Sequence, residues 1–168
     1  ALREQPIEHL VFDSDFAMGI VPERLCYICR ELKDITYNCE IKEIKPMAFR
    51  TCTSLNGNVI PEGLVDLDSN AFYGCSKLGG DIVIPETCGW IGEYAFRSCF
   101  MIHSITVLNA QAEVGQNAFG YAGLYAGAYI GDTTNALIYG YEGSPVQEYM
   151  THDERGDMSA WFVALEEN

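Results

Sequence analysis

Apolar residues return along this chain in a fixed order, with a period of 23 or 24 residues. Each copy holds an Ala-Phe pair, and the four pairs are Ala48-Phe49, Ala71-Phe72, Ala95-Phe96 and Ala118-Phe119. Three residues after each of the first three phenylalanines stands a cysteine, and three further an aliphatic residue: Cys52 and Leu55, Cys75 and Leu78, Cys99 and Ile102. A period of about 20–29 residues with apolar positions in phase predicts a solenoid of stacked coils.

Short strands are predicted between the phenylalanine blocks, at 57–60, 81–84 and 104–107. Alternation places Ile60, Ile84 and Val107 inward, and Val59, Val83 and Thr106 outward. Stacked coils would set these strands side by side in one parallel sheet with an exposed face. On the opposite side, the Phe-x-x-Cys-x-x-Leu spacing predicts short helical or 3-10 turns, because side chains three apart eclipse there.

The two ends of the array depart from the repeat. The first coil has Cys26 where phenylalanine belongs, and the last has Ala122 and Tyr125 in place of cysteine and leucine. Degenerate terminal coils are typical of solenoids, whose ends face water. We therefore expect one solenoid domain over 1–168. Its parts are degenerate N-terminal coil(s) at 1–48, three regular repeats of 23–24 residues at 49–118, and a degenerate last coil with a C-terminal cap at 119–168.

The terminal segments carry weaker signals. Residues 7–12 predict a first strand, and 22–32 have helical spacing, which fits either a helical first coil or an interface exposed by removal of upstream coils. Residues 136–142 predict a final strand. Ser144, followed by proline and then glutamine at the third helical position, predicts a helix through about Met150. Residues 160–165 predict a strand or an apolar strap on the last coil.

Residues 91–99, with the blocks 59–62 and 84–86, resemble the repeat unit of the BspA-like branch of the leucine-rich repeats. The resemblance covers about 40–120 and continues into 136–149, which is similar to the tail that closes such arrays. It implies a leucine-rich repeat solenoid, α/β-type and mostly β. It also implies an extracellular or cell-surface location on a bacterium. The chain starts without Met, so we expect a segment of a longer secreted protein.

The net charge of −14 narrows the choice of partners. Seven of the ten Lys and Arg residues lie in the first fifty positions, and only Arg155 follows residue 100. No basic stripe is apparent along the chain, so we expect neither nucleic acid nor anionic lipid as a partner. No stretch approaches 18 apolar residues, and membrane insertion is not expected.

The seven cysteines predict packing rather than chemistry. Cys29, Cys52, Cys75 and Cys99 stand in repeat phase, where the fold needs a small buried apolar group, although neighbouring coils leave one disulfide geometrically open. The Cys26-x-x-Cys29 spacing suits zinc but lacks a second ligand pair. Residues 66–77 begin like a calcium-binding loop, but Ala71 and Lys77 stand where such a loop requires glycine and glutamate. We expect neither metal nor cofactor.

Catalytic chemistry is also not expected. The three histidines, His9, His103 and His152, lie in no recognisable nucleophile or metal motif. No phosphate-binding glycine loop is present in the sequence either. We expect a protein that is not an enzyme and has no catalytic residues.

The sequence therefore predicts a non-catalytic protein-binding or adhesion module, with a host or bacterial surface protein as partner. The alternatives are a rigid spacer that presents another domain, and a carbohydrate-binding module with a glycan partner. Six of the ten tyrosines lie between 121 and 149, where they either cap the last coil or form an aromatic platform. The candidate binding residues are Val59, Asp81, Val83, Ser104, Thr106, Tyr125 and Tyr129.

Overall fold

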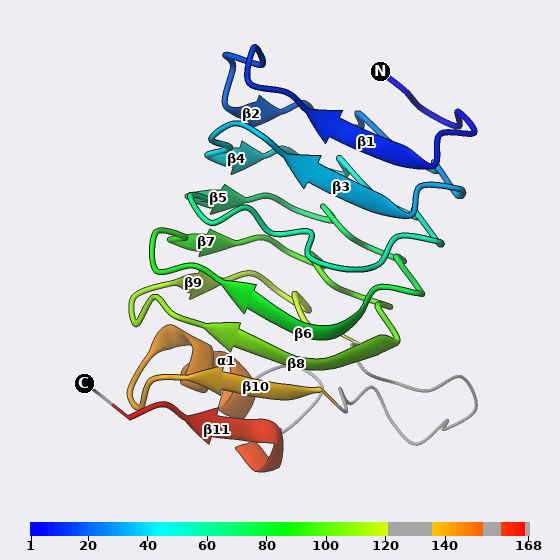
Figure 1. The fold of residues 1–168 in the computed structure, drawn as a ribbon. Coiled ribbons are helices and arrows are strands. Elements are labelled where there is room, and N and C mark those ends of the chain that lie inside the picture. The colour runs from blue at the N-terminus through cyan, green and yellow to red at the C-terminus, as the bar shows by residue number, and fades with distance from the viewer. Residues whose placement is uncertain (121–135, 153–158, 167–168) are drawn as a thin grey trace.

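The structure, a computed structural model, describes residues 1–120, 136–152 and 159–166. In these parts the chain winds into stacked coils, with the N-terminus at one end of the stack and the C-terminus at the other (Figure 1). All paired strands are parallel. The predicted fold class, a mostly β solenoid of the leucine-rich repeat kind, is confirmed.

The longer strands lie on one side of the solenoid. They are β1 (His9–Phe12), β3 (Asp34–Tyr37), β6 (Gly79–Ile84), β8 (Met101–Val107), β10 (Leu137–Gly140) and β11 (Phe162–Ala164). They form a two-stranded sheet, β1-β3, and a four-stranded sheet, β6-β8-β10-β11. The strands predicted at 7–12, 81–84, 104–107 and 136–142 are confirmed with shifted ends, and 160–165 takes the strand alternative.

A second sheet, which the prediction of a single sheet lacked, lies on another side. Its strands have two residues each: β2 (Ile20–Val21), β4 (Glu43–Ile44), β5 (Asp66–Leu67), β7 (Trp90–Ile91) and β9 (Glu113–Val114). Ile44, Leu67 and Ile91 point inward and are fully buried. A strand of two residues is too short to show the alternation by which a sequence reveals a strand.

The sheet of longer strands is interrupted at the third coil, which has 23 residues like the coils of β3 and β8 but carries a polar residue at an inward position. Ile35 of β3 and Ile105 of β8 each stand six residues after a repeat cysteine, and both are buried. The third coil has Asn58 at this position; Asn58 is exposed, and its Oδ1 accepts a hydrogen bond from the Ile60 amide at 3.4 Å. Val59 and Ile60 are 0% and 4% exposed, so both point inward and the period of two is lost. The strand predicted at 57–60 is wrong.

The third side consists of the Phe-x-x-Cys-x-x-Leu segments, which we call the turn face. We call the phenylalanine position of each coil the anchor position; Leu2, Cys26, Phe49, Phe72, Phe96 and Phe119 occupy it. Amide donors alternate between two kinds of bond. The Phe49 amide donates to the carbonyl of Ala71 in the next coil at 2.9 Å, whereas the Cys52 amide donates back to the Phe49 carbonyl at 3.2 Å.

This alternation requires an unusual backbone. Residues two before and two after the anchor position have positive φ, as Met47 (59°) and Thr51 (61°) do around Phe49. Non-glycine residues rarely adopt this conformation, and here the bonds to neighbouring coils hold it in place. The turn segments are therefore not helices, and the helical alternative for 22–32 is wrong. The turn segments share one feature with the predicted 3-10 turns: amides such as that of Cys52 donate to the carbonyl of residue i−3.

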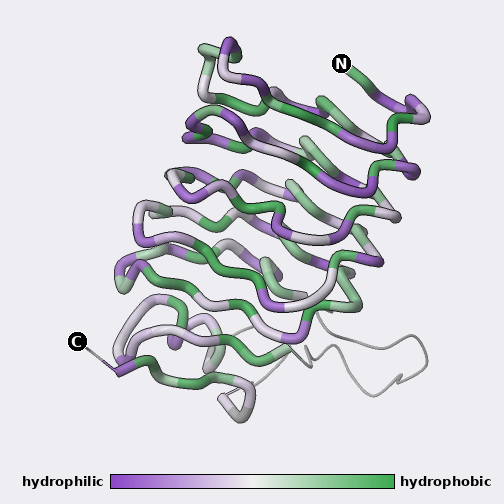
Figure 2. Tube along the Cα trace, in the orientation of Figure 1, coloured by the Kyte–Doolittle hydropathy of each residue, from purple (hydrophilic) through white to green (hydrophobic). Residues whose placement is uncertain are grey.

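A column of aromatic rings fills the core. Phe49, Phe72, Phe96 and Phe119 are fully buried, with successive ring centroids 5.3, 5.7 and 6.5 Å apart. Hydrophobic segments recur at corresponding places in successive coils (Figure 2). Because each ring packs on rings of neighbouring coils, no coil buries its own apolar face alone. The predicted burial of the repeat phenylalanines is confirmed.

The cysteines form a second column beside the rings. Cys29, Cys52, Cys75 and Cys99 are fully buried, as predicted, and their thiols are free. Each thiol donates to the anchor carbonyl of the preceding coil; Cys75 Sγ lies 3.1 Å from Phe49 O. The repeat therefore uses cysteine both as a small apolar group and as a weak donor between coils.

A helix closes the C-terminal part of the stack. It is α1 (Pro145–His152), followed by the 3-10 turn η1 (Ser159–Trp161). The Gln147 amide donates to Ser144 Oγ at 3.3 Å, so the predicted N-cap and the helix through about Met150 are confirmed. Tyr149 of this helix places its ring edge-on against Phe119, with centroids 5.3 Å apart, and so covers the end of the ring column.

Candidate binding faces

Four of the predicted binding residues lie together on β6 and β8. Asp81 pairs in register with Ser104, and Val83 with Thr106. Ser104 Oγ donates to Asp81 Oδ1 at 2.7 Å, and Val83 is 51% exposed. We call the outward side of β6, β8 and β10 the lateral face. It carries the predicted residues on a sheet whose inner side chains are fixed in the core.

The lateral face continues onto β10. Leu137 lies in register with Ser104, and Tyr139 with Thr106. Leu137 is 36% exposed and Tyr139 is half-buried. The face therefore presents a stripe of short polar, β-branched and larger apolar side chains on parallel strands.

The remaining predicted residues lie elsewhere. Val59 was expected on the outward side but is fully buried, because Asn58, at the position of the buried Ile105, is exposed and Val59 points inward instead. Val59 as a binding residue is therefore wrong. Tyr125 and Tyr129 lie outside the described residues.

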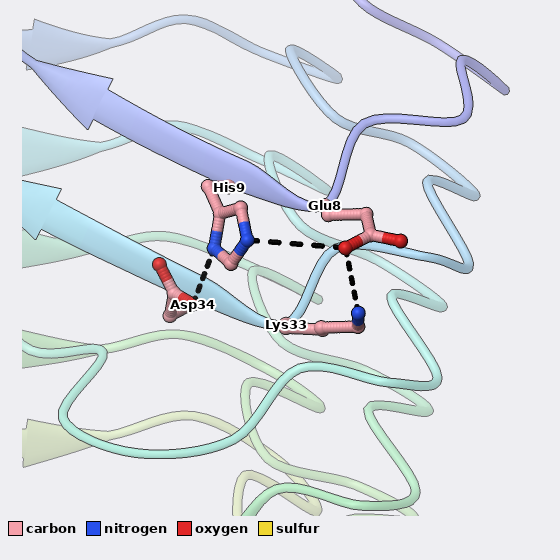
Figure 3. A network of polar contacts seen from close by, with 4 residues as sticks. All are labelled: Glu8, His9, Lys33 and Asp34. Atoms are coloured by element: carbon pink, nitrogen blue, oxygen red, sulfur yellow. Dashed lines mark hydrogen bonds and ion pairs between the residues drawn. The ribbon is translucent and has the colours of Figure 1, made fainter.

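Charged side chains gather where β1 and β3 begin, toward the N-terminal end of the same side of the solenoid (Figure 3). His9 Nδ1 lies 2.7 Å from Asp34 Oδ2, and Lys33 Nζ lies 2.6 Å from Glu8 Oε2. The hydrogen bond and charge of Lys33 lower the pKa of the Glu8 carboxyl. All four side chains are at least half exposed, so this network is a solvated cross-strand pairing rather than an enclosed centre.

A surface groove of about 800 Å³ lies beside the interruption of the long sheet. Tyr37, Ile60 and Pro61 are among the residues that line it, together with Glu40 and Glu62. Tyr37 Oη donates to the backbone carbonyl of Val59 at 3.0 Å. The sequence analysis missed this groove, although the polar Asn58 at an inward position of the repeat was a readable signal for it.

The chemistry of the described residues is limited. Among them, no three His, Cys, Asp or Glu side chains are placed to hold a metal ion. Burial raises the pKa of the Cys88 thiol to about 11, and it also raises the pKa values of Cys75 and Cys99. These thiols are therefore poor nucleophiles at neutral pH. In the described parts of the chain, every helix is too short or too polar to span a bilayer.

Stacked coils with a ring column and a thiol column define a leucine-rich repeat protein. In a comparison with protein families, residues 20–136 match the BspA type Leucine rich repeat region, in six copies. The match covers more than half of the chain, so the chain belongs to the BspA-type leucine-rich repeat family.

A search of solved structures found a similar fold in a leucine rich cell surface protein from Faecalibacterium prausnitzii A2-165. The TM-score is 0.56 and the sequence identity is 17%, so the likeness concerns the fold alone. The similarity covers 77% of this chain and 48% of that one; the present chain thus spans about half the length of that protein. No curated protein matches the chain.

Proposed function

We propose that the chain is a non-catalytic module that binds a protein partner at the surface of a bacterium. The observation that carries this proposal is the lateral face, where Asp81, Val83, Ser104 and Thr106 lie in register on parallel strands. Their side chains have few rotatable bonds, so a partner would immobilise little side-chain entropy on docking.

The surface location rests on the family and on the solved neighbour, which is described as a cell surface protein. Among the described residues, no three His, Cys, Asp or Glu side chains are placed to hold a metal ion, and the buried thiols are poor nucleophiles; both observations support a role without catalysis. Fold alone does not assign function, so the proposal depends on the face itself.

The test begins with a panel of purified matrix and bacterial surface proteins, measured against the immobilised chain by biolayer interferometry. For any binder found, Val83→Glu and Thr106→Arg should each weaken binding by about tenfold or more, because both place a charge in the desolvated contact. Glu86→Arg changes an exposed residue outside the lateral face and serves as the control. Melting temperatures of all three variants should stay close to that of the parent.

A second outcome would point to a different role. If no panel protein binds, or if both lateral-face variants bind as the parent does, the face is not the docking surface. The continuous bonding between coils would then favour the rigid spacer that presents another domain.

A further inference from the structure

One row of side chains on the turn face alternates between arginine and tyrosine. It consists of the residues one after the anchor position in five successive coils: Arg3, Tyr27, Arg50, Tyr73 and Arg97. We call this row the arginine–tyrosine ladder. Backbone hydrogen bonds between coils run through the same segments, so successive members lie one coil apart. The row is not apparent until the repeat register is fixed.

The guanidinium groups of the ladder lie over tyrosine rings. Arg3 lies 5.1 Å from the Tyr27 ring centroid, and Arg50 lies 4.5 Å from that of Tyr73. Arg97 lies 5.4 Å from the ring of Tyr94, in its own coil. Arg3 Nε also donates to Glu4 Oε1 at 2.9 Å. Cation–π contacts of this kind hold a guanidinium over the ring, and the planar fork of guanidinium N–H donors matches a carboxylate.

The ladder lies in a basic region of an acidic protein. Six of the ten Lys and Arg residues fall on the turn face, between two residues before and five after an anchor position: Arg3, Arg24, Arg30, Arg50, Lys77 and Arg97. In the same positions of the described coils, the acidic residues are Glu4 and Glu31, and Glu23 and Glu93 stand one position before this range. Arg3 pairs with Glu4 at 2.9 Å and Arg24 with Glu23 at 3.5 Å. The fold thus brings most of the basic residues to the turn face, although they are scattered in chain order.

The spacing of the arginines suits a repeating ligand. Arg3, Arg50 and Arg97 occupy every second coil, which at ~4.8 Å per coil sets them about 9.6 Å apart. A tyrosine hydroxyl stands between each pair. This order, anion receptor and then hydroxyl, matches a chain in which charged and uncharged sugars alternate.

We propose that the ladder binds an acidic polysaccharide that carries one carboxylate on every second sugar. The arginine edges would accept the carboxylates in bidentate hydrogen bonds, and the tyrosine hydroxyls would bond to the intervening sugar hydroxyls. The proposal goes beyond the protein-binding function and uses a different face of the molecule.

Two other anionic polymers fit these observations less well. Single-stranded nucleic acid is held by bases that stack on open aromatic faces, and here guanidinium groups cover faces of Tyr27 and Tyr73. Polyglutamate and nucleic acid also carry a charge on every unit, so a protein with a net charge of −14 repels them more strongly.

Hyaluronan oligosaccharides are the probe, because they carry one carboxylate per disaccharide. Binding to the full chain is measured by isothermal titration calorimetry at low and at physiological salt. Arg50→Ala with Arg97→Ala should weaken binding by about tenfold or more, since each removes a charge-assisted bidentate contact. Lys42→Ala with Lys45→Ala removes the same charge from residues outside the turn-face positions and should change binding by less than about twofold.

Two further measurements separate contact from general charge. Arg50→Lys with Arg97→Lys keeps the charge but not the planar fork, so this variant should bind more weakly than the parent. In the unaltered protein, hyaluronan should protect Arg50 and Arg97 from modification by phenylglyoxal. Mass spectrometry measures the extent of modification, and this experiment needs no substitution.

Several results would overturn the proposal. They are the absence of hyaluronan binding at low salt, an equal loss in the Lys42 and Lys45 variant, and parent-like binding by the double lysine variant. Tighter binding of oligo-dT or polyglutamate than of hyaluronan would reassign the ladder to nucleic acid or to an acidic polypeptide. None of these outcomes depends on the lateral face, whose Val83 and Thr106 variants should bind hyaluronan as the parent does.

Discussion

At the residue scale, burial of the cysteine column determines how many thiols react with a thiol reagent. Burial raises the pKa of the Cys75 and Cys99 thiols and of Cys88, the latter to about 11. A thiol with a pKa near 11 is about 0.1% thiolate at pH 8, so its reaction with Ellman's reagent is slow. We predict that at pH 8 the folded protein titrates at about one thiol, the half-buried Cys39, and the unfolded protein at all seven.

The same column predicts that reductant does not change the thermal stability of the protein. The thiols are free, and the turn segments are held by backbone bonds between coils. Melting curves with and without reductant, and with and without chelator, should superimpose. A shift of several degrees with reductant would mean that a disulfide or metal, rather than packing, stabilises the array.

Asp66 is a residue whose ionisation opposes folding. Its Oδ1 is buried without a hydrogen-bond partner among the described residues. Burial raises the pKa of the Asp66 carboxyl, and the nearby charge of Asp68 raises it further. An acid with a raised pKa favours the folded state while it is protonated, and that contribution is lost as the pH rises through the folded-state pKa.

We therefore predict that Asp66→Asn raises the melting temperature at pH 7, and that the gain disappears near pH 3, where the parent carboxyl is protonated. Glu113→Gln, on an exposed side chain of the same sheet, is the matched control and should change little at either pH. A lower melting temperature for Asp66→Asn at pH 7 would show that the carboxylate has a partner it needs.

The coil is the element on which stability depends. Phe72 stacks on Phe49 and on Phe96, so it belongs to three coils at once. Phe72→Ala should cost about 3–5 kcal/mol, the usual cost of truncating a buried phenylalanine. Urea denaturation followed by circular dichroism measures this loss. Because coils depend on their neighbours, hydrogen exchange should accelerate in β3 and β8 as well as beside the substitution; faster exchange confined to one coil would contradict the coupling.

Much of this architecture could be predicted, because a repeat multiplies each signal. Phe72, Cys75 and Leu78 have counterparts in phase, and their burial follows from the period alone. The second sheet could not be predicted, since one inward and one outward residue per strand show no alternation. The error at Val59 arose because the period alone aligns Val59 with Thr106, whereas the third coil has Asn58 in place of the buried Ile105 that keeps the alternation. Prediction of the lateral face required only the alternation of residues in β6 and β8. Recognition of the arginine–tyrosine ladder required five coils aligned in register.

Asn58 of the third coil provides an element-scale test. Asn58→Ile supplies the inward aliphatic side chain that Ile35 and Ile105 provide at the same position, so that Val59 turns outward and the period of two is restored. We predict that the third coil then forms a strand that joins β3 to β6 in one continuous sheet. Amides of Asp34–Tyr37 and Gly79–Ile84 should exchange more slowly, because edge groups become paired. Asn58→Asp keeps a polar acceptor at this position and is the control; equal protection in both variants would contradict the explanation.

At the scale of the whole molecule, the solenoid must end without exposing its stacked rings. Near the N-terminus Phe12 stacks on Tyr37, with centroids 5.4 Å apart, and Phe16 covers Phe12 edge-on, with centroids 5.0 Å apart and planes at 65°. At the C-terminal end of the ring column, Tyr149 covers Phe119 at 5.3 Å and 82°. Each of these two ring stacks therefore ends at a ring that lies edge-on to it. Terminal units with a water-tolerant outer face keep solenoids soluble, because an open end is complementary to another open end.

Tyr149→Ala removes one of these closing rings and leaves the Phe119 end of the column open. We predict a loss of about 1–3 kcal/mol in the free energy of unfolding and self-association that grows with concentration, because the exposed end offers an apolar surface to a second copy. Light scattering during size-exclusion chromatography measures the association. Tyr149→Phe keeps the ring and loses only the hydroxyl, which lies 3.4 Å from the Phe119 amide, so it should remain monomeric wherever the parent is. Association by both variants would attribute it to the lost hydroxyl, and association by neither would show that the last coil closes without this ring.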